Sequence, residues 1–389
     1  MAIIQIVQWD DSVNSNDVLA WRYVDKKNPA KSEELGNWKP EEKLIMSDAD
    51  FPLWHAEIKV DRPEIIEYKY VVYDLKTGAV TDTEWGENRQ IWGVEKGLVI
   101  CQNDRGFRRT QPRWKGAGVA VPVFSLRTDE GFGIGEFQDL KKLAQWAALT
   151  GQKMIQTLPI NDTTLLHTNR DSYPYNAVSV FALHPIYLNI EKMGKMSVTL
   201  RHQYYAKKEE LNSKPIADYQ TVYDEKMKYF LALYRQDKEA VFSSNEYKTF
   251  FEKNKEWLVP YAVFCYLRDK NGTPHFVDWK KYSVFSEQDM RRLSTPSARE
   301  YDKVAFFYYL QFHLDRQLSD AIAYSHSLGV ALKGDIPIGI SPDSVDAWTN
   351  PELFNLNASA GAPPDDFSIS GQNWGFPTYN WDVMAQDGF

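Results

Sequence analysis

The sequence predicts two structural units, an all-β sandwich followed by an α/β unit that contains a helical insertion. Residues 1–103 hold short apolar runs separated by turn clusters, and residues 104–116 form a polar segment punctuated by Pro and Gly. From residue 117 onward, apolar runs alternate with amphipathic helical segments. The length of 389 residues suits two units, because single hydrophobic cores usually stop growing near about 250–300 residues.

The first unit, residues 1–103, is expected to be built from short strands. The runs that predict strands are Ile3–Val7, Leu44–Met46, Trp54–Val60, Glu67–Tyr73 and Gly97–Cys101. Turn clusters such as Asp48-Ala49-Asp50 separate them, and about 100 residues with this rhythm are typical of a β-sandwich. Trp54 alternates with apolar neighbours and is expected in the core. The following segment, 104–116, is predicted to be a linker.

The second unit, residues 117–389, opens with a strand–helix–strand pattern. Gly118–Phe124 and Lys153–Leu158 have the apolar character of buried strands, and Phe137–Thr150 has helical spacing between them. This order predicts a right-handed βαβ unit. Residues of about 191–300 predict a helical insertion, which includes the stretches Tyr223–Arg235, Tyr247–Trp257 and Val259–Arg268. The amphipathic helix Tyr301–Leu328 then precedes a third strand, Gly329–Ile338. The last 50 or so residues look rich in loops.

Three βα units are too few to close a barrel. An eight-stranded α/β barrel needs about 250 residues without insertions, and the helical insertion takes up about 110 of the residues between 117 and 389. Either the sheet is open or these residues are part of a longer barrel.

Composition excludes several classes of function. The formal net charge is −8 and no basic run occurs, which argues against nucleic acid or an anionic membrane as a partner. No apolar stretch is long enough to span a membrane. The two cysteines are far apart in the sequence, so neither a zinc site nor a disulfide framework is indicated, and a cytoplasmic location is expected. Aromatic residues reach 14 %, which fits a large aromatic core or surfaces that stack on sugar rings.

Five motifs in the second unit resemble the amylomaltase family of 4-α-glucanotransferases, and more narrowly its disproportionating enzyme two branch. They are GVAVPVFSLRTDEGFGIGEFQDL (118–140), QTLPINDT (156–163), DSYPYNAVSVFALHPIYL (171–188), GDIPIGISPDSVDAWTNPELF (334–354) and GAPPDDFSISGQNWGFPTYNWD (361–382). The resemblance implies that residues 117–389 form the first part of a (β/α)8 barrel with a helical insertion.

Four motifs in the first unit resemble a family-20 starch-binding module. They are LGNWKP (35–40), PLWHAEI (52–58), EYKYVV (67–72) and EWGENR (84–89). The resemblance implies a glucan platform formed by Trp38 and Trp85, with Lys69 and Asn88 beside it. One departure concerns spacing, because Trp85 precedes Asn88 by three residues where the commoner pattern has five.

The resemblance also implies which residues contact substrate in the second unit. Asp335 is expected beside the nucleophile at the end of the third strand, and Tyr175 in the glucan cleft. Gln372 and Trp374 are expected in a Gly-flanked loop that arches over bound glucan. Asp365 and Ser172 are weaker candidates.

Retaining glycosyl transfer requires a nucleophilic carboxylate and an acid/base carboxylate about 5–5.5 Å apart. By resemblance, both are expected C-terminal to Phe389, so no catalytic residue is assigned within the chain, and the chain by itself is predicted to be inactive. No metal and no organic cofactor is implied.

Two further segments suggest other chemistry at first sight. His184 lies in an apolar context and is expected to be structural rather than a general base. The GFGIG run at 131–135 lacks the full spacing of a dinucleotide site and is expected to form a mobile loop at the barrel mouth.

The expected function is transfer of glucosyl or maltodextrin units from maltose or maltodextrin to a starch- or glycogen-like polysaccharide. Two alternatives stay open. A hydrolase of the α-amylase clan would use water as acceptor, and a non-catalytic glucan-binding protein would result if the chain naturally ends at residue 389.

Overall fold

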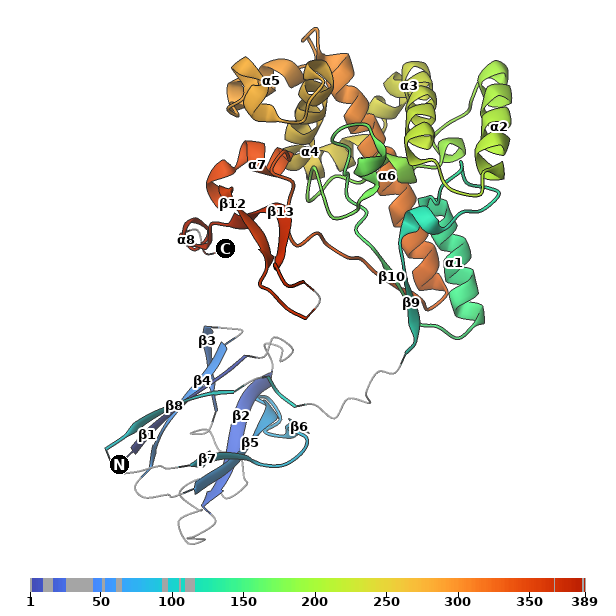
Figure 1. Cartoon of the computed structure of the whole chain (residues 1–389). Helices are drawn as coiled ribbons and strands as arrows, with labels where there is room; N and C mark the ends of the chain where they lie inside the picture. The colour runs from blue at the N-terminus through green and yellow to red at the C-terminus, as the bar shows by residue number, and fades with distance from the viewer. Residues whose placement is uncertain are drawn as a thin grey trace. The chain divides into compact units, whose positions relative to one another are not determined.

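The computed structural model divides into two compact units, residues 1–115 and 116–389 (Figure 1). It describes residues 2–9, 17–25, 45–50, 53–60, 65–92, 97–104, 106–108, 116–366, 368–386 and 388. In this described part, no helix combines the length and the apolar character that a membrane span requires.

The described residues of the first unit form two four-stranded sheets. One sheet has the order β3 (Ser47–Asp50), β4 (Leu53–Val60), β1 (Ala2–Trp9) and β8 (Val99–Asp104). The other has β5 (Ile65–Asp74) paired with β2 (Asp17–Asp25), β6 (Val80–Thr83) and β7 (Arg89–Trp92). β1 is antiparallel to β4 and parallel to β8. The all-β prediction for this unit agrees with the structure.

The strand boundaries show where the sequence pattern was informative. The runs Trp54–Val60 and Glu67–Tyr73 lie within β4 and β5, and Trp54 is buried as expected. Asp48-Ala49-Asp50, which predicted a turn, belongs to β3 instead. β3 is a short strand at the edge of its sheet, where polar residues are tolerated because one side of the strand has no neighbour.

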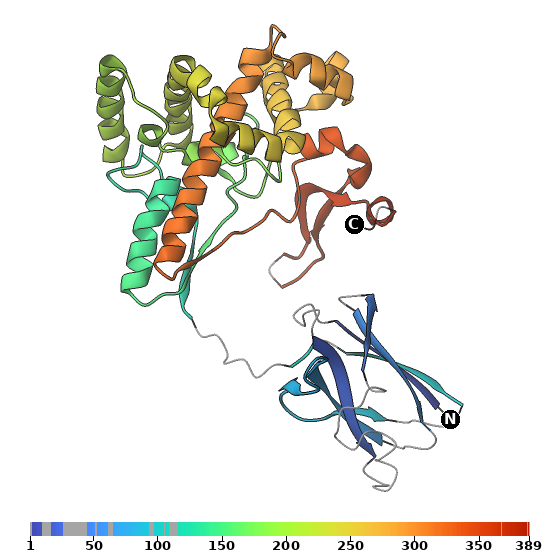
Figure 2. The same cartoon turned by 180° about the vertical axis from the view of Figure 1, so that it is seen from behind.

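The second unit contains a three-stranded parallel sheet with the order β11 (Ala331–Lys333), β10 (Met154–Thr157) and β9 (Gly118–Val121). Helices α1 (Phe137–Leu149) and α6 (Tyr301–Ser327) lie side by side against this sheet, as both views show (Figures 1 and 2). Ala144, Ala147 and Ile155 are fully buried between helix and sheet. The predicted βαβ unit and third strand are therefore present.

The sheet of the second unit is open, so the predicted barrel is not confirmed by the structure. In the described residues, β9 and β11 each pair with β10 alone. Three strands cannot curl far enough to bring their edges together, because the smallest α/β barrels close with eight.

The helical insertion between β10 and β11 is present as predicted. It comprises α2 (Val198–Ser213), α3 (Tyr219–Ser243), α4 (Asn245–Asn271) and α5 (Glu287–Ser294). α4 runs unbroken through Pro260, whereas the sequence suggested two segments divided between Trp257 and Val259. The residues after Pro260 are buried among α3 and α6, and this packing offsets the one backbone hydrogen bond that proline removes.

The GFGIG segment forms a loop, as expected, but this loop is packed inside the second unit, which does not fit the expected mobility. Residues 131–135 are all buried, with Phe132 stacked on Tyr204 of α2. A Cβ on Gly135 would lie 1.9 Å from the carbonyl oxygen of Val123, so this close backbone approach requires glycine.

The C-terminal region differs from the loop-rich prediction. It contains α7 (Val345–Thr349), a hairpin of β12 (Phe354–Ala362) and β13 (Gln372–Tyr379), and α8 (Trp381–Met384). The β12 sequence, FNLNASAGA, alternates apolar with polar or small residues, a pattern that the loop-rich prediction passed over. The register of β12 shifts twice against β13.

Candidate functional site

Asp335 and Tyr175 meet at the carboxyl end of β11. The Tyr175 hydroxyl donates a hydrogen bond to Oδ2 of Asp335 at 3.0 Å, although the residues lie 160 positions apart. The backbone N–H of Ile336 donates to Oδ1 at 3.0 Å. Burial and the hydrogen bond to Asp335 raise the pKa of Tyr175, so the phenol remains a donor. The structure thus brings together two side chains that the sequence assigned to one cleft.

Backbone hydrogen bonds hold the Tyr175 segment against the segment that follows β11. The N–H of Ser341 donates to the carbonyl of Ala177 at 3.1 Å, and that of Val345 donates to the carbonyl of Val178 at 2.9 Å. The Asp346 carboxylate accepts the N–H of Val180 at 3.1 Å. These bonds fix the two segments in register, so the Tyr175–Asp335 contact rests on a rigid base.

Two glutamines of α6 hold the continuation of the same segment. The Gln311 side chain accepts from the N–H of Leu183 at 2.9 Å and donates to its carbonyl at 2.8 Å. Gln317 forms the same pair of bonds with the backbone of Asn189, at 2.8 and 2.9 Å. Each glutamine side chain thus bonds one backbone N–H and one backbone carbonyl, as a neighbouring strand would. Helix α6 in this way positions a segment that lies outside the strands of the sheet.

Lys226 of α3 forms hydrogen bonds with the backbone of the same segment, between Leu183 and Asn189. Its Nζ donates to the carbonyls of Ile186 at 2.6 Å and Leu188 at 2.8 Å, and to Oε1 of Glu136 at 2.5 Å. Both charged side chains are inaccessible to solvent. Glu136 also begins α1, so one buried ion pair joins the insertion to the βαβ unit.

Gln372 and Trp374 lie on strand β13 rather than in the loop that the sequence predicted. Trp374 is 46 % exposed, and its Nε1 donates to Oε1 of Gln372 at 3.0 Å. The hairpin is held next to the Asp335 segment by the Tyr379 hydroxyl, which donates to the carbonyl of Ile338 at 2.8 Å. A strand gives the indole a fixed direction, which a loop would not.

The weaker candidates make local contacts. Asp365, between β12 and β13, accepts the N–H of Ser368 at 2.7 Å, and the Ser172 hydroxyl donates to the carbonyl of Asn169 at 2.7 Å. His184 is buried, and burial lowers its pKa to about 4. Its Nδ1 accepts the N–H of Ile186 at 3.1 Å, which agrees with the expected structural role.

Three residues predicted for the starch-binding platform line one hollow in the first unit. Lys69, Trp85 and Asn88 border a cavity of about 780 Å³, and Trp85 is 58 % exposed. The Lys69 ammonium donates to the carbonyl of Gly86 at 2.5 Å, and Asn88 Nδ2 donates to Glu67 at 3.1 Å. Trp85 and Asn88 therefore face the same hollow despite their short spacing.

Trp38, the second predicted platform tryptophan, lies outside the described residues.

Glu84 also lines this hollow and Arg108 contacts Glu84, and the sequence motifs assigned neither residue a role. Glu84 lines the hollow beside Trp85, and its buried carboxylate accepts from Arg89 and Arg108. Glu84 lies within the EWGENR motif, so an acidic residue next to the platform tryptophan was an available signal. Arg108 gave none, because its contact spans 24 positions.

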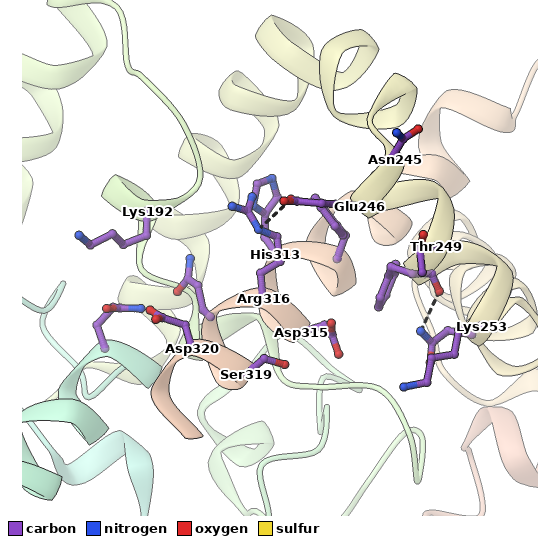
Figure 3. Close-up of a pocket in the computed structure, with 15 residues that line it drawn as sticks. Lys192, Asn245, Glu246, Thr249, Lys253, His313, Asp315, Arg316, Ser319 and Asp320 are labelled. Carbon is purple, nitrogen blue, oxygen red and sulfur yellow. Dashed lines mark hydrogen bonds and ion pairs between the residues drawn. The ribbon is translucent and has the colours of Figure 1, made fainter. Parts of the chain in front are cut away.

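A separate groove of about 900 Å³ lies among α1, α4 and α6 (Figure 3). Its side chains carry both signs of charge, including Lys192, Lys253 and Arg316 opposite Asp315 and Asp320. The aromatic rings that border it are buried, so it offers no flat surface for stacking on sugar. None of the predicted substrate residues borders it, and we do not place the glucan cleft there.

No metal centre is found in the part of the chain that the structure describes, since no three His, Cys, Asp or Glu side chains converge there as ligands would.

Comparison with known proteins gives two family matches. Residues 121–389 match a family described as 4-alpha-glucanotransferase, and residues 31–98 match a family described as starch binding domain. The chain is 38 % identical over 362 residues to the 4-alpha-glucanotransferase DPE2 of Oryza sativa subsp. japonica, covering 92 % of this chain and 38 % of that protein.

Two further comparisons agree. The 4-alpha-glucanotransferase of Chlamydia pneumoniae is 34 % identical over 279 residues, covering 70 % of this chain and 50 % of the relative. In fold, the chain is similar to the amylomaltase from Streptococcus agalactiae solved in complex with acarbose, with a TM-score of 0.58, 23 % identity, and coverage of 71 % and 55 %. The chain spans half or less of the length of these two curated relatives. It belongs to the 4-alpha-glucanotransferase family.

Proposed function

We propose that the protein transfers glucosyl or maltodextrin units between α-1,4-glucans. The Tyr175–Asp335 pair carries this proposal, because it places a carboxylate and a phenol at the carboxyl end of a parallel strand. Functional residues of α/β sheets gather at that end. Family membership supplies the reaction class, and the exposed Trp374 beside the same segment supplies an aromatic surface for a sugar ring.

The proposed chemistry is retaining double displacement. A nucleophilic carboxylate forms a glycosyl-enzyme, and a second carboxyl group protonates the leaving oxygen and then activates the acceptor hydroxyl. Asp335 would orient sugar hydroxyls beside the nucleophile, since its contacts in the described residues are the Tyr175 hydroxyl and the Ile336 N–H. In this proposal β9, β10 and β11 are the first three strands of a (β/α)8 barrel, and no cofactor takes part.

The proposed donors are maltose and maltodextrins, and the proposed acceptor is a starch- or glycogen-like polysaccharide in the cytoplasm. The starch binding domain match and the hollow around Trp85 support a polymeric glucan as one partner. An exposed indole stacks on the C–H face of a glucose ring, while Lys69 and Asn88 can bond its hydroxyls. Binding at the module would keep the acceptor chain near the transferase unit.

Product analysis tests the reaction. The protein is incubated with maltose and the oligosaccharides are separated by chromatography. Glucose together with longer oligomers is expected for transfer, whereas glucose alone would favour hydrolysis and overturn the proposal.

A further inference from the structure

The loop that presents Trp85 is built around a buried carboxylate. The Glu84 side chain is inaccessible to solvent, and its carboxylate accepts hydrogen bonds from Nε and Nη2 of Arg89 at 3.0 and 2.5 Å. Nη2 of Arg108 donates to Oε2 of Glu84 at 3.1 Å, the oxygen that also accepts from Nε of Arg89. Burial alone would raise the pKa of Glu84, but the two arginines lower it below its usual range. The Glu84 carboxylate is therefore ionised and held in one position by the two arginines.

Arg108 forms hydrogen bonds with three residues of the same loop, Glu84, Trp85 and Glu87. The N–H of Trp85 donates to the carbonyl of Arg108 at 2.6 Å, and the N–H of Arg108 donates to Glu84 at 3.1 Å. The Arg108 guanidinium also donates to the carbonyl of Glu87 at 2.7 Å. Both ends of residues 84–87 are thus fastened to one arginine, with the indole of Trp85 between them.

The two arginines have different tasks. Arg89 is part of β7, and its guanidinium also reaches Asp104 at 3.1 Å and lies over the ring of Tyr70. It ties Glu84 to the sheets of the module. Arg108 contacts the loop backbone on either side of Gly86, whose φ of +87° gives the loop its bend. Loss of the Arg108 side chain would remove the bonds to the Glu84 carboxylate and the Glu87 carbonyl and loosen the loop, while its backbone bonds and the sheets remain in place.

We propose that Arg108 is a positioning residue for glucan binding, acting through the orientation of Trp85. The proposal rests on the proposed glucan-binding function of the module. Arg108 follows β8, beyond the residues 31–98 that match the starch binding domain, in the segment that leads to the second unit. Arg108 lies within the first compact unit, residues 1–115, so this unit supplies a contact to the Trp85 loop from outside the matched range.

The test is calorimetric titration of the 389-residue chain with β-cyclodextrin, a ring of α-1,4-linked glucose. Arg108→Gln should raise Kd about tenfold, or about 1.4 kcal/mol. Lys59→Gln is the matched control, because Lys59 is an exposed residue of β4 in the other sheet and the charge change is the same. Its Kd should equal that of wild type. An unchanged Kd in Arg108→Gln would overturn the proposal.

A double-mutant cycle separates positioning from a general loss of stability. If Arg108 acts through Trp85, adding Arg108→Gln to Trp85→Ala should not weaken binding further. Two effects that add in full would overturn the proposal. Unchanged binding in Trp85→Ala would instead contradict the proposed glucan-binding function, so the two failures are distinguishable.

A conservative variant covers the case in which Arg108→Gln does not fold. Arg108→Lys keeps the charge but cannot span Glu84 and Glu87 with one planar group. It should retain the wild-type unfolding midpoint and show a severalfold higher Kd. A wild-type Kd in Arg108→Lys would show that the guanidinium geometry is not needed.

Discussion

Replacement of Lys226 by Met should destabilise the second unit strongly. Nζ makes three hydrogen bonds in the interior, to Glu136, Ile186 and Leu188, and neither charged side chain is accessible to solvent. Methionine has a similar volume, so the change removes the charge and the bonds but little packing. A buried carboxylate and two carbonyls then lose their partner, and breaking a buried pair in this way costs about 3–5 kcal/mol.

The deficit should depend on pH. Burial raises the pKa of Glu136 and Lys226 opposes that shift, so loss of Lys226 raises the pKa further. A carboxyl group whose folded pKa lies above its unfolded value stabilises the fold at low pH, and that contribution is lost as pH rises through the folded pKa. Lys226→Met should therefore be closest to wild type near pH 5 and furthest from it near pH 8.

Urea unfolding followed by circular dichroism at 222 nm measures the effect, because the described helices all lie in residues 116–389. Lys228→Met is the matched control. Lys228 lies on the same helix and pairs with Glu225 at 2.8 Å, but 69 % of its side chain is exposed. It should lose about 0.5 kcal/mol or less. A free energy of unfolding for Lys226→Met within about 1 kcal/mol of wild type would refute the reasoning.

Two further substitutions test the segment around Asp335. Gly339→Ala should lower the free energy of unfolding in urea by about 1–3 kcal/mol, because a Cβ there would lie 2.2 Å from the Phe376 ring. Gly334→Ala is the control, since a Cβ at that position would have no atom within 4 Å, and it should change stability by less than about 0.5 kcal/mol. Equal effects of the two substitutions would contradict the packing around Gly339. Burial raises the pKa of Asp346 to about 6, so its contribution to stability is lost as pH rises from about 4 through about 6. The free energy of unfolding of Asp346→Asn should therefore increase relative to that of wild type as pH rises across that window. Parallel pH profiles of the two proteins would contradict this prediction.

Periodicity in the sequence predicted the elements whose packing is regular. The helix of residues 137–149 and the flanking strands follow from apolar spacing, since each buries one face or both. The β12–β13 hairpin was missed although β12 alternates apolar with polar or small residues, because its apolar positions after Leu356 are alanines and β13 contains Gly375 and Pro377, which are typical of turns. The prediction divided α4 between Trp257 and Val259, although burial of the residues after Pro260 keeps the helix continuous.

Contacts between distant residues could be predicted only by resemblance. Nothing in the spacing of Tyr175 and Asp335 indicates a hydrogen bond across 160 positions, yet their motifs implied one cleft. Arg108 lay in a segment predicted to be a linker, and its long-range contacts with Glu84 and Glu87 have no local signature. The local sequence pattern therefore predicted helices and strands, whereas contacts between distant residues determine how these elements pack together.

Glucan binding by the 389-residue chain tests the central claim most directly. Calorimetric titration with maltoheptaose and with cellohexaose compares α-1,4- and β-1,4-linked glucose. We expect binding of maltoheptaose, a loss of about tenfold or more in Trp85→Ala because an exposed aromatic anchor is removed, and no binding of cellohexaose. Equal affinity for both sugars, or no binding of maltoheptaose, would contradict the account.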